Sequence, residues 1–79
     1  MDKHEFEQSV TEHGKDILRF CRMNAGSTER GNELYQDTMV KLLEKQKKLD
    51  AAQNIKSYAM QTAILLWKAR KIRRRNRHF

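Results

Sequence analysis

The basic residues near the end of the chain are the side chains with the clearest chemistry. Positions 68–77 hold seven Lys and Arg residues and no Asp or Glu. The residues before position 68 hold ten basic and ten acidic side chains, which cancel, so the net charge of +7 resides at this end. A neutral body with one cationic end suits a polyanion, and nucleic acid fits better than an acidic protein or a lipid surface. The alternative is a solvated helix end, whose macrodipole favours two or three cations but not seven.

The other reactive side chains form no catalytic or metal-binding pattern. His4, His13 and His78 are scattered, and there is no glycine-rich phosphate loop or Cys/His metal spacing. His13 lies on or beside an apolar stripe, where packing is favoured over a role as ligand or base. Cys21 lies on an apolar face, which favours a packed thiol over a catalytic one. We therefore predict a binding module and not an enzyme, with no metal, cofactor or small-molecule substrate.

The composition also favours a cytoplasmic location. The single cysteine cannot form an internal disulfide and fits a reducing compartment. No apolar run approaches the roughly 20 residues that a membrane span needs, and residues 1–5 do not resemble a signal peptide.

The basic residues must be carried by a helix, because the segment 54–77 has helical periodicity and lacks glycine and proline. Asn54 is a plausible N-cap. The first half of this helix is expected to be buried and the second half to be cationic. Its apolar face is formed by Ile55, Tyr58, Ala59, Thr62, Ala63, Leu66, Ala69 and Ile72.

Two further helices are predicted before it. The first spans about 4–23, with a kink or short break near Gly14 and a stop at Asn24 or Gly26. The second spans about 28–47 and is capped by Ser27 or Thr28. Its buried stripe is expected to contain Leu34, Tyr35, Thr38, Met39, Leu42 and Leu43, with Leu49 packed under the third helix. A chain of 79 residues forms one domain with a small core, so we predict an all-α, small three-helix bundle with a long basic C-terminal helix.

The second helix carries the most specific motif, Glu33-Leu34-Tyr35-Gln36-Asp37-Thr38-Met39-Val40-Lys41-Leu42, which is followed by Asn54-Ile55-Lys56-Ser57-Tyr58 and the arginine-rich run. In this order the motifs resemble region 2 of bacterial sigma-70-type RNA polymerase sigma factors, of the extracytoplasmic-function (ECF) group. The resemblance covers about residues 5–77. Residues 1–79 are thus expected to be one sigma region 2 domain. Region 4 is absent from this chain, which we expect to be an excised domain; the alternative is a divergent factor that lacks its second half.

The resemblance implies two binding surfaces. One would bind the clamp helices of the β′ subunit of core RNA polymerase, where the alternative is an ordinary solvated helix face. The residues assigned to it are Asn32, Glu33, Gln36, Asp37 and Lys41. The other would recognise and melt the promoter −10 element, which is partly single-stranded. The residues assigned to it are Lys56, Tyr58, Gln61, Trp67, Lys68, Lys71, Arg74 and Arg75.

Several alternatives stay open. Tyr58 and Trp67 could be core aromatics as readily as stacking surfaces. In the family an Arg-Asn pair is frequent near the promoter base that is flipped out of the duplex. Ile64 and Leu65 replace this pair here, so the details of base recognition are expected to differ. A general basic helical nucleic-acid-binding module without polymerase is the second hypothesis, and a membrane-surface helix is disfavoured because the apolar residues precede the cations. An anti-sigma factor is a further partner that the resemblance allows.

Overall fold

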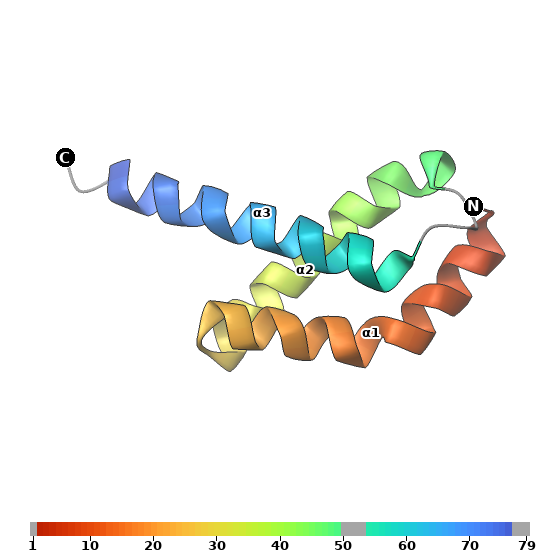
Figure 1. The fold of residues 1–79 in the computed structure, drawn as a ribbon, viewed down its shortest axis with the longest axis horizontal. Coiled ribbons are helices and arrows are strands. Elements are labelled where there is room, and N and C mark those ends of the chain that lie inside the picture. The colour runs from red at the N-terminus through yellow and green to blue at the C-terminus, as the bar shows by residue number, and fades with distance from the viewer. Residues whose placement is uncertain (1, 50–53, 77–79) are drawn as a thin grey trace.

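The chain folds into three α-helices in the computed structural model, which describes residues 2–49 and 54–76, with only the backbone described for 71–76. Helix α1 spans Lys3–Ala25, α2 spans Thr28–Lys45 and α3 spans Ile55–Asn76. One short 3-10 helix, η1 (Gln46–Lys48), extends α2. No strand occurs in the described ranges, so the all-α, three-helix prediction is confirmed (Figure 1).

Polar side chains cap the start of each helix. At α1, the Asp2 carboxylate accepts a hydrogen bond from the Glu5 amide at 2.8 Å. The Ser27 hydroxyl accepts from the Arg30 amide at 3.1 Å, and the Asn54 side chain accepts from the Ser57 amide at 3.2 Å. These bonds satisfy amides that have no partner within the first turn of a helix. The predicted caps of α2 and α3 are therefore confirmed, while that of α1 was not anticipated.

The predicted end of α1 agrees with the structure, whereas that of α2 differs. A kink or short break was expected near Gly14; no break occurs, since α1 is continuous through this residue, and the ribbon changes direction part-way along the helix (Figure 1). Helix α1 ends where Gly26 adopts a left-handed conformation with φ 79°, which glycine reaches without steric cost. Helix α2 ends at Lys45, two residues earlier than predicted, because the chain tightens into η1.

One hydrophobic core joins the three helices. Ile17 and Cys21 of α1, Leu34 and Leu42 of α2, and Ala59 and Ala63 of α3 are fully buried. Leu49 and Ile55 belong to the same buried cluster, as expected for a Leu49 packed with the third helix. Thr38 is also fully buried, and its hydroxyl donates to the Leu34 carbonyl at 2.7 Å.

The buried stripes are narrower than predicted. Leu43 is 59% exposed, because it follows the buried Leu42 by about 100° around α2 and so faces solvent. Ala69 is exposed as well, since the hydrophobic packing of α3 ends at Leu66 and Trp67 among the residues whose side chains are described. Ile72 lies outside the described side chains.

Helices α1 and α2 approach closely at Gly31. A Cβ atom placed on Gly31 would lie 2.4 Å from the Cα of Arg22, so the two backbones are nearly in contact. Helix α3 packs on both α1 and α2, and its C-terminal part continues past the turn that joins them (Figure 1). The fold therefore carries the backbone of the basic segment beyond the bundle.

Candidate protein-docking and nucleic-acid interfaces

The residues assigned to polymerase binding lie on the outer face of α2. Glu33, Gln36 and Lys41 are exposed, and Asn32 and Asp37 are half-buried. The opposite face of α2 carries the buried Leu34, Thr38 and Leu42. The five predicted residues are thus brought together on the solvent side of one helix, from its α1 flank to its α3 flank.

An arginine of α3 bridges two carboxylates of this face. The Arg70 Nη2 donates to the Asp37 carboxylate, and its Nη1 lies 3.5 Å from the Glu33 Oε2. The Arg70 side chain is 27% exposed, against 48% for Asp37 and 58% for Glu33. Sequence reasoning assigned Arg70 to neither surface. The only sequence signal for this contact was the spacing of Glu33 and Asp37. Residues four apart lie one turn apart on a helix, so a single guanidinium can reach both carboxylates.

Other members of the face also have partners within the chain. The Arg22 Nε of α1 donates to the Asn32 side-chain oxygen at 3.0 Å. Lys41 forms an exposed ion pair with Glu44 at 3.6 Å. Gln36 makes no side-chain hydrogen bond to another residue of the described ranges. Its amide is therefore the member of the face that is best placed to meet a partner.

Two exposed apolar side chains extend this face and were missed as functional residues. Val40 is 51% exposed and Leu43 is 59% exposed. Together with Gln36 they occupy positions i, i+4 and i+7, which form one line along a helix. Val40 was assigned to neither surface, and Leu43 was predicted to lie in the core. The outer face of α2 therefore has an apolar strip with carboxylates on its α3 side.

The second predicted surface lies on α3, and the structure separates its residues. Gln61 and Lys68 are exposed and lie two turns apart on the same face. Leu65 lies between them and is 67% exposed, which agrees with its position outside the apolar face predicted for this helix. Lys56 instead turns toward α1, where its Nζ lies 3.2 Å from the Asp16 Oδ2.

The two aromatic residues of the α3 set pack against the core. Tyr58 and Trp67 are both half-buried and contact the hydrophobic cluster. Lys71, Arg74 and Arg75 belong to α3, but their side chains lie outside the described residues. That Lys71 and Arg75 share a face with Lys68 stays a prediction from their spacing in the sequence.

The buried thiol is a packing residue. Cys21 is fully buried, as predicted, and burial raises its pKa, while a hydrogen bond with Thr38 acts in the opposite direction. A neutral, enclosed thiol is a poor nucleophile. Across residues 2–49 and 54–76, no three His, Cys, Asp or Glu side chains gather closely enough to hold a metal ion. No helix in the same ranges has the length and apolar character to cross a membrane.

Comparison with known proteins identifies the family. No curated protein and no solved structure matches this chain. The family model described as Sigma-70 region 2 matches residues 9–78, which include all of α2 and α3 and most of α1. Its members belong to transcription initiation factors, in which this domain takes part in promoter recognition and in binding core RNA polymerase. The chain therefore belongs to the sigma-70 region 2 family.

Proposed function

We propose that this domain docks on the clamp helices of the β′ subunit through the outer face of α2, and recognises and melts the promoter −10 element through α3. The exposed line of Gln36, Val40 and Leu43 on α2 carries the proposal, because it lies within the residues that the family model matches. We further propose that the domain belongs to a cytoplasmic sigma factor of the ECF group.

The outer face of α2 suits a partner that is itself helical. A line of side chains at i, i+4 and i+7 packs into the grooves of another helix. Val40 and Leu43 would give apolar contact, and the Gln36 amide can both donate and accept a hydrogen bond. Glu33 and Asp37 keep exposed oxygen atoms beside Arg70, and these can accept charge-assisted hydrogen bonds from basic residues of the clamp helices. Such pairs would fix the register of the two helices.

The outer face of α3 suits unpaired DNA. Proteins that hold single strands combine cations for the backbone with flat or apolar surfaces for the bases. Lys68 gives a cation, and Leu65 gives an exposed apolar surface one turn away. Lys71, Arg74 and Arg75 are proposed to extend the cationic track. Because the strand binds only when it is unpaired, binding itself shifts the promoter toward the melted state, without ATP or covalent chemistry.

Gln36 gives the cleanest test of docking. Replacing Asp37 would also break its contact with Arg70, whereas Gln36 has no described side-chain partner. We expect Gln36→Arg to weaken binding of a β′ clamp-helix fragment by at least about tenfold, since it places a cation against basic partner residues. Gln8→Arg adds the same charge at an exposed glutamine of α1 and should leave the affinity unchanged. Equal affinity of the Gln36→Arg variant and the unchanged domain would refute docking through this face.

The second candidate function is a basic helical module that binds nucleic acid without polymerase. The charge of the segment 68–77 favours it equally, but it leaves the exposed Val40 and Leu43 without a role. The two functions differ in sequence preference. A sigma domain should prefer single-stranded −10 DNA over a scrambled strand of the same composition, and equal binding to both would favour the general module. An anti-sigma factor remains a proposed further partner, and its binding is not required by either function.

A further inference from the structure

A shallow groove runs along α1 on the side next to α2, where it borders the α1 flank of the α2 face through Arg22 and lies apart from the α3 surface. It consists of two hollows, of about 610 and 370 Å³, which share Lys15 and Leu18. The larger hollow also contains Arg19, Arg22 and Met23, and ends at the turn between α1 and α2. The smaller one continues toward Val10, Gly14 and Tyr35.

The charged side chains of the groove are all cations. Lys15, Arg19 and Arg22 line it, and no Asp or Glu among the described residues lines either hollow. Neither Lys15 nor Arg19 forms an ion pair with a residue of the described ranges. Arg22 is held in place by its Nε bond to Asn32, so its remaining guanidinium N–H groups are oriented in advance.

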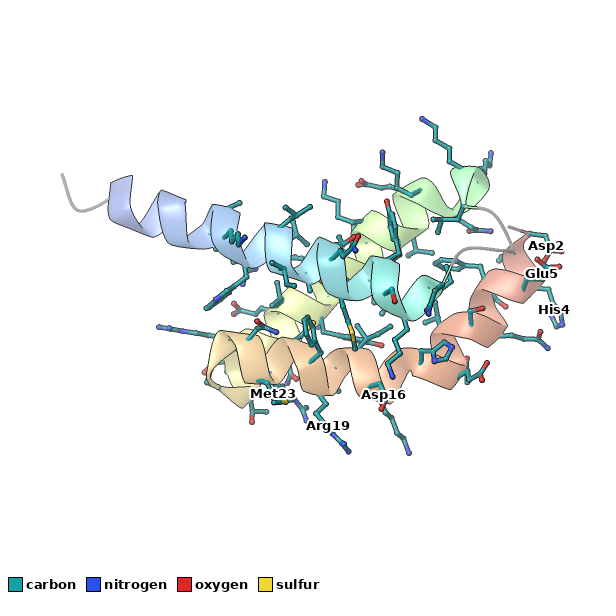
Figure 2. The ribbon with its side chains drawn as sticks, in the orientation of Figure 1. Asp2, His4, Glu5, Asp16, Arg19 and Met23 are labelled. Carbon is teal, nitrogen blue, oxygen red and sulfur yellow. The ribbon has the colours of Figure 1, made fainter. Side chains whose placement is uncertain are left out.

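Apolar side chains lie between these cations. Met23 is 76% exposed, and Leu18 is half-buried in the floor of both hollows. Figure 2 shows Arg19 and Met23 projecting from the edge of α1 that faces away from α3. An exposed methionine beside arginines is a combination found at adaptable protein-binding surfaces.

We infer that this groove is a docking site for an acidic amphipathic helix of a protein partner, distinct from the clamp helices and from DNA. From Val10 to Met23 the chain rises by about 20 Å, which accommodates about four turns of a partner helix. Leucines of the partner would contact Leu18 and Met23, and its carboxylates would meet Lys15, Arg19 and Arg22. This use of α1 goes beyond the proposed function, since it needs neither the outer face of α2 nor α3.

The chemistry favours a protein over a nucleic acid as the occupant. A phosphate backbone needs cations, but the bases need stacking surfaces, and within the described part of the chain Tyr35 is the only aromatic residue that lines either hollow. The Tyr35 hydroxyl lies against Gly14, where it is 3.4 Å from the position of an added Cβ atom, and its ring packs on the core. Met23 and Leu18 would contribute nothing to phosphate binding, whereas they match the apolar face of a helix.

A synthetic peptide tests the inference with the full 79-residue chain. The probe is a helical peptide of about four turns with leucines at helical spacing and glutamates on both flanks, and binding is followed by fluorescence anisotropy. We expect saturable binding that Arg19→Glu weakens by at least about tenfold and that Met23→Ser also weakens. Lys48→Glu, which reverses an exposed cation in η1, is the matched control and should leave the affinity unchanged. Circular dichroism establishes that each variant keeps its helix content.

The inference fails under any of three results. The first is that the peptide does not bind, or that a scrambled peptide of the same composition binds equally well. The second is that Lys48→Glu and Arg19→Glu weaken binding to the same extent, which would indicate only general charge attraction. The third is that Arg19→Glu weakens binding of single-stranded DNA and leaves peptide binding unchanged, which would assign the groove to nucleic acid. None of these results bears on the Gln36 test of polymerase docking.

Discussion

Arg70 of α3 donates to the carboxylate of Asp37 on α2, and this contact joins the two helices that carry the proposed polymerase and DNA surfaces. The same guanidinium lies 3.5 Å from Glu33. One cation thus faces two carboxylates, so the cluster keeps a formal charge of −1 at the edge of the α2 face. A basic partner helix would meet an acidic surface that Arg70 already partly neutralises.

Removing this cation should lower stability modestly. The groups are partly exposed, and pairs of this kind contribute roughly 0.5–1 kcal/mol to the free energy of unfolding. Arg70→Met should therefore lower the melting temperature by a few degrees, because about 1 kcal/mol corresponds to about 4–8 °C in a domain of this size. Urea unfolding of Arg70→Met, Asp37→Asn and the double variant gives the coupling energy. Arg19→Met is the control, and additive effects of the two single changes would show that the contact does not stabilise the fold.

The two helical glycines should respond oppositely to alanine. At Gly31 an added Cβ atom would lie 2.4 Å from the Arg22 Cα, so the helices must separate, at a cost of about 1–3 kcal/mol or more. At Gly14 the nearest atom is the Tyr35 hydroxyl at 3.4 Å, and alanine has the better helix propensity by about 1 kcal/mol. Thermal unfolding should show Gly31→Ala destabilised and Gly14→Ala equal to or more stable than the unchanged chain. The reverse order would contradict the close approach of α1 and α2.

The Cys21 thiol should be protected and should make stability decrease at alkaline pH. Burial raises its pKa in the folded chain, whereas the unfolded chain has the ordinary value of about 9. Above about pH 9 the unfolded chain therefore loses a proton that the folded chain keeps, and the free energy of unfolding falls as pH rises toward the folded pKa. The difference in urea unfolding between the unchanged chain and Cys21→Ala should narrow from pH 8 to pH 10. A thiol reagent should label Cys21 only after unfolding, and rapid labelling of the folded chain would refute its burial.

Single-stranded DNA binding should depend steeply on salt. If four cations of α3 contact phosphates, the logarithm of the binding constant should fall with the logarithm of salt concentration with a slope of about −3. Lys68→Ala should reduce the magnitude of this slope by about one, because one counterion fewer is released on binding. Lys48→Ala should leave the slope unchanged. Titrations at several salt concentrations measure both. A slope near zero would place the DNA surface elsewhere than on the basic segment.

The elements of the fold could be predicted from the sequence because their signals are local. Caps such as Ser27 and Asn54 act within three residues, and the apolar periodicity reports burial along one helix. The arrangement of the candidate sites could not be predicted, because it depends on how helices cross. Arg70 and Asp37 are 33 positions apart, and nothing along either helix indicates that they meet. Leu43 was placed in the core because its hydrophobicity was counted without knowledge of the width of the buried face.

The close approach at Gly31 has a consequence for how the surfaces respond to a bound partner. Main-chain atoms of α1 and α2 meet there, and backbone in two helices deforms less readily than interlocking side chains do. Arg22, whose Cα forms the contact, lines the α1 groove and also holds Asn32 on the outer face of α2. Binding at either surface would therefore act on Arg22 or on its partner Asn32, so the two surfaces are linked through this helix crossing.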